Sequence, residues 1–159
     1  MTANDEMMVP PDVVYVTYIR ATPQRVWDAL TKGEDTQRYF FGFRIEGEWR
    51  TGARWALYGD EGVHDDGEVL ECDPPRRLKI SWNVRAFEDA RGLPPAYIAY
   101  EIEPLGETVR LTMTQHQPKP IPRKYHEGGK QGWPMILSSL KSYLETGAPL
   151  VIETPAPPQ

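Results

Sequence analysis

The chain has 159 residues, a length that fits one domain with tails. Its 18 basic and 23 acidic side chains give a net charge of −5, which argues against nucleic acid, because such a partner selects a basic face. No run of eighteen apolar residues occurs, so we expect no membrane-spanning helix. The start shows no secretory signal, and the single cysteine, Cys72, favours a reducing compartment; we therefore predict a cytoplasmic protein.

The two ends of the chain differ from its middle. Residues 1–11 show no helix or strand period and end in two prolines, and residues 148–159 carry four prolines. We expect a disordered tail at 1–11, a Pro-rich tail at 148–159 and a single domain over 12–147.

The first elements are a strand and two short helices. Residues 13–19 are rich in β-branched and aromatic side chains, which predicts a strand. Thr22-Pro23 predicts a helix start, because threonine caps free amides and proline suits the first turn. We expect this helix to end at Gly33 and a second short helix to cover 35–40.

The middle of the chain is typical of antiparallel strands, which we place at residues 55–58, 68–72, 77–85, 98–103 and 109–114. The acidic segment 59–67 is interpreted as a solvated hairpin tip. In each of the last three strands apolar and polar residues alternate, so one face packs and the other is wet. The alternation is clearest for Leu78, Ile80, Trp82 and Val84.

The last element is a helix whose apolar stripe follows the helical period at Trp133, Ile136, Leu137, Leu140 and Leu144. Gly147 ends it, and Pro134 is placed in its first turn or at a kink. A sheet and a helix with matching apolar faces predict an α+β fold. In it, a curved antiparallel sheet wraps around a long C-terminal helix, with two short helices after the first strand.

Such a sheet leaves a gap beside the helix wherever side chains do not fill it. For any one apolar residue a packed core is the simpler interpretation, but the set as a whole favours a ligand pocket. The predicted lining is Trp55, Trp82, Tyr100 and Met113 from strands, Trp133, Ile136, Leu137 and Leu140 from the helix, and Tyr39, Phe40, Phe41 and Phe43 at one end. His116 ends an apolar strand and is placed at the mouth of this pocket.

The sequence gives little indication of metal binding, catalysis or phosphate binding. The histidines His64, His116 and His126 lack metal-ligand spacing, so we predict no metal, no cofactor and no catalytic residue; His126 is expected to be solvated. The segment GGKQGW lacks the phosphate-loop order, and its glycines are interpreted as permitting close approach of helix and sheet. Glu71 has an ambiguous direction and, if it faces inward, must find a partner such as Arg54 or Arg77 or stay protonated.

Three segments together resemble a known family. The segment Ile19-x-Ala21-Thr22-Pro23-x-x-Val26-Trp27 is similar to the start of START-like (SRPBCC) proteins. The segments Gly67-Glu68-Val69-x-Glu71-x-Asp73-Pro74-Pro75-Arg76-Arg77-Leu78 and Gly132-Trp133-Pro134-x-Ile136-Leu137 resemble the activator of heat-shock-protein-90 ATPase homologues. The resemblance spans residues 13–147.

This resemblance implies a helix-grip fold with a deep cavity that the superfamily uses for lipids, polyketides and other apolar molecules. The leading hypothesis is therefore a binding protein for an apolar or aromatic small molecule. One alternative is a chaperone regulator or other interaction module, including a homodimer, which would expose an apolar patch. The other is a cyclase or hydratase, which would need a polar pair in the cavity, such as Tyr100 with His116 or an inward Glu71.

Overall fold

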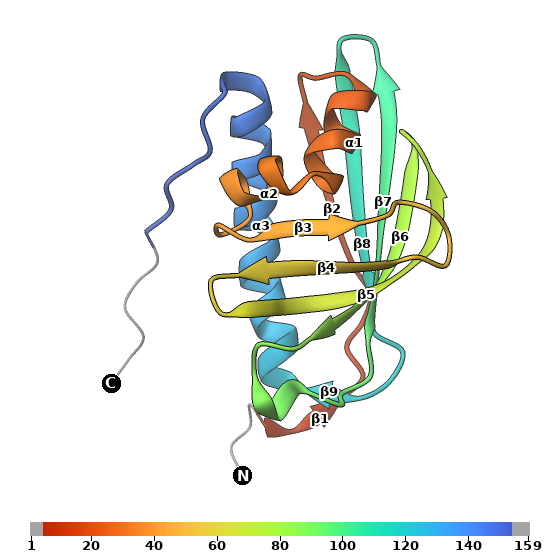
Figure 1. Cartoon of the computed structure of the whole chain (residues 1–159), viewed down its shortest axis with the longest axis vertical. Coiled ribbons are helices and arrows are strands. Elements are labelled where there is room, and N and C mark those ends of the chain that lie inside the picture. Colours follow the sequence, from red (N-terminus) through yellow and green to blue (C-terminus); the bar gives the residue numbers. More distant parts are fainter. Residues whose placement is uncertain (1–4, 154–159) are drawn as a thin grey trace.

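The computed structural model describes residues 5–153. Seven antiparallel strands form one sheet in the order β2-β8-β7-β6-β5-β4-β3. Their bounds are β2 Val13–Ile19, β3 Arg44–Gly47, β4 Arg54–Gly59, β5 Gly62–Asp73, β6 Arg77–Val84, β7 Ala96–Leu105 and β8 Thr108–His116. The sheet curves around the long helix α3, Arg123–Thr146, and the short helices α1, Pro23–Thr31, and α2, Gly33–Tyr39, lie near the C-terminal end of α3 (Figure 1). The predicted helix-grip fold is confirmed.

Local capping interactions explain where the two short helices begin and end. The Thr22 hydroxyl accepts a hydrogen bond from the Arg25 amide at 3.1 Å, and Pro23 occupies the first turn of α1. α1 ends at Thr31 because Lys32 is extended. Gly33 therefore begins α2 and does not end α1 as predicted, and the second helix starts two residues earlier than expected.

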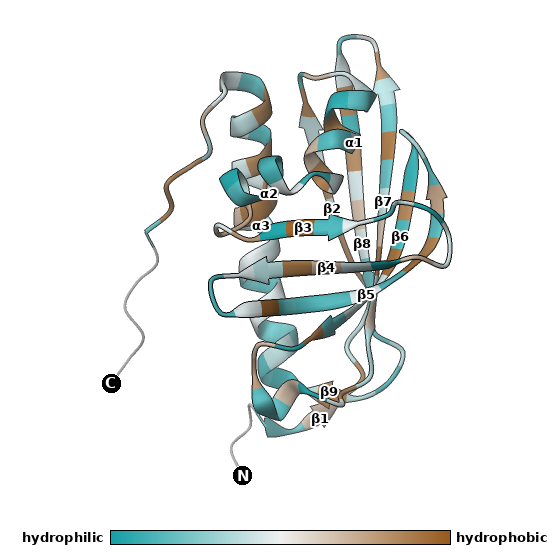
Figure 2. Cartoon of the chain, in the orientation of Figure 1, coloured by the Kyte–Doolittle hydropathy of each residue, from teal (hydrophilic) through white to brown (hydrophobic). Residues whose placement is uncertain are grey.

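The apolar rows of the sheet point inward as their alternation predicts. The buried members from β6, β7 and β8 are Leu78, Ile80, Ile98, Tyr100, Ile102, Val109, Leu111 and Met113. They pack with α1, α2 and the C-terminal half of α3 into one core. Figure 2 shows apolar residues along these strands and on the middle turns of α3, whereas the visible faces of α1 and α2 are largely hydrophilic.

Segment 59–67 differs from the prediction. β5 begins at Gly62, so the solvated tip is reduced to the turn between Gly59 and Gly62, and most of the acidic segment is strand. Gly62 has φ 114°, which lets the chain reverse in so short a turn. The acidic composition concealed this strand from sequence reasoning.

Helix α3 also differs, because it begins at Arg123, ten residues before Trp133. Pro134 therefore lies inside the helix and not in its first turn. At the other end Gly147 adopts φ 84° and its amide donates to the Tyr143 carbonyl at 2.8 Å, which ends the helix as predicted.

Parts of both expected tails have defined structure. Strand β1, Met7–Met8, pairs with β9, Ile121–Pro122, just before α3 begins. At the C-terminal side the Leu150 amide donates to the Ser139 hydroxyl at 3.1 Å. Residues 1–4 and 154–159 of the predicted tails lie outside the described residues. Within residues 5–153 no helix is long and apolar enough to cross a membrane.

Candidate functional site

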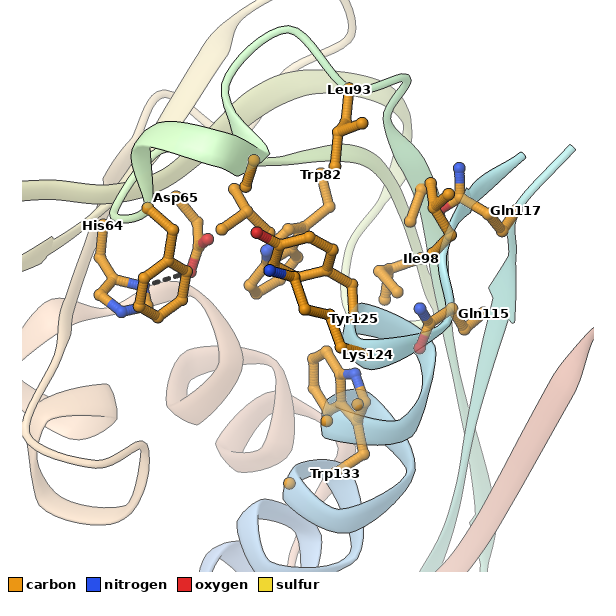
Figure 3. A pocket seen from close by; sticks show the side chains of 18 of the residues that line it. His64, Asp65, Trp82, Leu93, Ile98, Gln115, Gln117, Lys124, Tyr125 and Trp133 are labelled. Carbon is orange, nitrogen blue, oxygen red and sulfur yellow. Dashed lines mark hydrogen bonds and ion pairs between the residues drawn. The ribbon is translucent and has the colours of Figure 1, made fainter. Parts of the chain in front are cut away.

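A cavity of about 560 Å³ lies between the N-terminal half of α3 and the sheet (Figure 3). Its walls come from strands β5 to β8, from the turn 40–43 and from the loop between β6 and β7, which includes a short 3₁₀ turn, Glu88–Ala90. This volume falls in the range of ordinary small-molecule sites.

Three aromatic rings separate the cavity from the core. The ring centroids of Phe40 and Trp82 lie 6.1 Å apart, those of Phe40 and Trp133 5.7 Å, and those of Trp82 and Trp133 5.5 Å. All three residues also line the cavity. The rings of Phe40 and Trp82 are stacked and Trp133 stands edge-on to both, so the cavity floor is aromatic and held by mutual ring packing.

Part of the helical wall of the cavity is made of glycines, which carry no side chains. Gly128, Gly129 and Gly132 line this wall, and a Cβ added at Gly128 or Gly132 would meet no atom within 4 Å. The interpretation of these glycines as permitting close approach of helix and sheet is therefore wrong for these two positions. Their effect is to leave open space beside α3.

Two polar residues of β5 enter this largely apolar space. His64 and Asp65 both line the cavity, and Nδ1 of His64 lies 2.8 Å from Oδ2 of Asp65 (Figure 3). The Asp65 side chain is 7% exposed and that of His64 is 29% exposed. The hydrogen bond with Asp65 raises the pKa of His64, although burial acts in the opposite direction.

The mouth is bounded by polar links between loop and helix. Asp89, in the β6–β7 loop, pairs with Lys124 and accepts a hydrogen bond from the Tyr125 hydroxyl at 2.7 Å. The buried Gln117 side-chain amide donates to the carbonyls of Pro94 and Pro95. These bonds hold the loop against α3 and β8.

Of the predicted lining residues, Phe40, Phe41, Phe43, Trp82, Trp133 and Ile136 line the cavity. Those that lie in the packed core and do not line it are Tyr39, Trp55, Tyr100, Met113, Leu137 and Leu140. On α3, Ile136 lines the cavity and the adjacent Leu137 does not, because successive helical residues point about 100° apart, and Leu140 lies closer to the end of α3 that packs with α1 and α2. Local bonds fix two of the buried rings: the Tyr39 hydroxyl donates to the Ala29 carbonyl at 2.7 Å, and the Trp55 indole donates to the Ser81 carbonyl at 3.0 Å.

The polar residues suggested from the sequence lie elsewhere. The His116 side chain is 51% exposed, pairs with Asp12 and does not line the cavity. Glu71 points outward and accepts a hydrogen bond from Arg77 at 2.6 Å. His126, expected to be solvated, is buried in α3, because the helix begins before it.

Sequence reasoning missed His64, Asp65, Gln115, Gln117, Lys124 and Tyr125 in the cavity wall. A signal for Asp65 was present, since residues two apart in a strand share a face. Counting back from the buried Val69 through Gly67 reaches Asp65. Within the described part of the chain no group of three or more His, Cys, Asp or Glu residues could hold a metal ion.

Comparison with known proteins agrees with this architecture. The model of a family described as Activator of Hsp90 ATPase homolog 1-like protein matches residues 20–145, which confirms the resemblance derived from the sequence. A search of curated proteins finds no match.

Among solved structures, protein MLL2253 from Mesorhizobium loti is 27% identical with a TM-score of 0.72, over 84% of this chain and 96% of that one. DynU16, described as a putative protein in the dynemicin biosynthetic locus, is 26% identical with a TM-score of 0.69, over 87% of this chain and 48% of that one. The Aha1 dimer from Colwellia psychrerythraea is 20% identical with a TM-score of 0.69, over 87% of this chain and 98% of that one. The last likeness is one of fold alone.

Proposed function

Because the chain belongs to the family of Activator of Hsp90 ATPase homolog 1-like proteins and has an aromatic cavity of about 560 Å³, we propose that it binds an apolar, aromatic small molecule there. The observation that carries the proposal is the empty wall at Gly128 and Gly132. Glycine costs a helix interior about 1 kcal/mol relative to alanine, so an unfilled wall made of glycines is more readily understood as room for a guest.

The chemistry of the lining supports a flat guest. Rings of Phe40, Trp82 and Trp133 form the floor, and aromatic faces favour offset stacking or edge contacts with another ring. Each Å² of apolar surface removed from water contributes about 25 cal/mol before the costs of binding. The likeness to a protein of the dynemicin biosynthetic locus supports a small-molecule partner, and the unpaired Cys72 supports our placing this function in the cytoplasm.

Native mass spectrometry of freshly purified protein, combined with calorimetric titration of 2-methoxynaphthalene as a probe, tests the proposal. Gly132→Phe places a ring in the cavity without a clash at Cβ and is expected to weaken probe binding at least about tenfold. Ser138→Phe is the matched control, because Ser138 is exposed on α3 outside the cavity, and it should bind like the unmodified chain.

Two results would contradict this function. One is a chain that carries no small molecule and binds no naphthalene probe. The other is a Gly132→Phe variant that binds the probe as well as Ser138→Phe does, because the probe would then lie outside the cavity.

A second candidate is self-association through β2. This strand is an edge of the sheet, and its outward side chains Val14, Val16 and Tyr18 are exposed; an open apolar edge favours pairing with another strand. A related fold is described as a dimer, and we propose a second copy of this chain as the partner. Light scattering at increasing concentration tests it: a dimer that Val16→Lys converts to monomer is expected, and a monomer at all concentrations overturns it.

A further inference from the structure

His64 and Asp65 are adjacent in sequence, yet both reach the cavity. Consecutive residues of a regular strand point to opposite faces. Here Leu57 pairs with Asp65 and Tyr58 pairs with Val63, so His64 is an extra residue in β5 with no partner on β4. Such a bulge redirects a side chain, and bulges are frequent beside functional sites. The bulge brings an imidazole and a carboxylate to one wall.

The carboxylate determines which imidazole nitrogen is available to a ligand. Asp65 is buried opposite Leu57 and accepts from Nδ1 of His64 at 2.8 Å. With Nδ1 carrying a proton, Nε2 is the remaining hydrogen-bonding atom of the ring. No residue of the range 5–153 forms a hydrogen bond with Nε2.

The surroundings of His64 add no competing charge. The Phe43 ring packs on the imidazole with centroids 4.2 Å apart, and the Phe87 ring lies edge-on at 6.1 Å. Arg85, the residue after β6, pairs with Asp66, and across the cavity Asp89 pairs with Lys124 and accepts a hydrogen bond from the Tyr125 hydroxyl. Asp65 is therefore the carboxyl partner of His64, and the two rings that pack against the imidazole, Phe43 and Phe87, are apolar.

We propose that Nε2 of His64 is the hydrogen-bond anchor of the cavity and selects aromatic ligands with an acidic hydroxyl, such as a phenol or an enol. This inference rests on the proposed function and specifies its ligand class. The ligand O–H donates to Nε2. Where the proton transfers, the O–H bond breaks, Nε2 gains the proton, and the oxyanion pairs with an imidazolium that Asp65 stabilises. No further reactant is needed.

The test compares 2-naphthol with 2-methoxynaphthalene, which share a ring system but differ in the hydroxyl. Calorimetric titration of the unmodified chain at about pH 8.5, where the neutral imidazole with a free Nε2 lone pair is favoured, is expected to show 2-naphthol binding at least about tenfold more tightly, the value of one hydrogen bond to an ionisable group. His64→Asn keeps a donor for Asp65 but removes Nε2. It should abolish this preference, so that the variant binds the two probes equally.

His116→Asn is the matched control, because His116 also pairs with an aspartate, Asp12, but on the surface; it should keep the preference. Equal binding of both probes by the unmodified chain overturns the inference and leaves the proposed function standing. A preference that persists in His64→Asn also overturns it. Binding of neither probe counts against the proposed function itself, and the anchor falls with it.

Discussion

At the scale of single residues, Asp35 joins the three helices at the end of the molecule opposite the cavity. It accepts hydrogen bonds from Arg25 at 2.9 and 3.0 Å and from the Tyr143 hydroxyl, and its side chain is 8% exposed. Asp35→Asn keeps the shape but removes the charge. We expect it to lower the free energy of unfolding by about 2 kcal/mol at pH 7, between the values for surface and buried pairs, as measured by urea denaturation.

The same carboxylate predicts a pH dependence. Burial raises the pKa of Asp35, but the hydrogen bonds from Arg25 and Tyr143 lower it by more, so the pKa lies below its ordinary value. Its contribution is therefore fully present above about pH 4, the ordinary value, and is lost as the pH falls through the lowered one. The free energies of unfolding of the unmodified chain and of Asp35→Asn should therefore become equal at acidic pH. A difference that stays constant with pH would refute this account, and Glu48→Gln, at an exposed pair with Arg50, should change little.

At the scale of elements, the N-terminal half of α3 is an intrinsically weak helix. It contains Gly128, Gly129 and Gly132, and Pro134 supplies no amide to the helical ladder. Ionic links from Asp89 to Lys124 and pairing of β1 with β9 compensate at its start. The wall of the cavity is thus held more by tertiary contacts than by helix propensity.

Gly132→Ala tests this description of α3. The new Cβ meets open space, so alanine should raise the free energy of unfolding by about 0.5 to 1 kcal/mol through its helix propensity. Gly147→Ala is the control with opposite sign, because Gly147 ends α3 at φ 84° and alanine there should lower stability by about 1 kcal/mol. Thermal and urea denaturation measure both changes; a loss of stability in Gly132→Ala would mean that the helix is packed where we find it open.

The same elements show what a sequence can predict. The strand β2 and the start of α1 were predicted correctly, since β-branched composition and a Thr-Pro cap are local signals. The start of β5 was missed because its inward positions are taken by Asp65 and Gly67. The first ten residues of α3 were missed because glycines that open a cavity also remove the helical stripe. Both missed segments line the candidate site, where polar residues and glycines replace the apolar residues that would otherwise mark a strand or a helix in the sequence.

At the scale of the whole molecule, the interior divides into a filled and an open half. Met113 from β8, Ile98 from β7, and Leu140 and Ile136 from α3 are all buried apolar residues of the core, but only Ile98 and Ile136 also line the cavity. The division depends on how far along α3 the helices α1 and α2 reach, which is a property of the assembled fold. Sequence periodicity identified the inward face but carried no information on which part of it stays uncovered.

If the filled and the open half are independent, a mutation in the core should change the free energy of unfolding without changing the increase that a bound ligand adds to it. Leu111 is fully buried in the core and does not line the cavity, so Leu111→Ala should cost about 2 to 5 kcal/mol. It should still gain about 2.7 kcal/mol from 2-naphthol at a hundred times the dissociation constant, as the unmodified chain does. Gly132→Phe should have nearly the same free energy of unfolding as the unmodified chain, but 2-naphthol should not increase it. Urea denaturation with and without 2-naphthol measures both quantities. A Leu111→Ala variant that loses the ligand increment would show that the core shapes the cavity, because removal of a side chain outside the lining would then have changed binding.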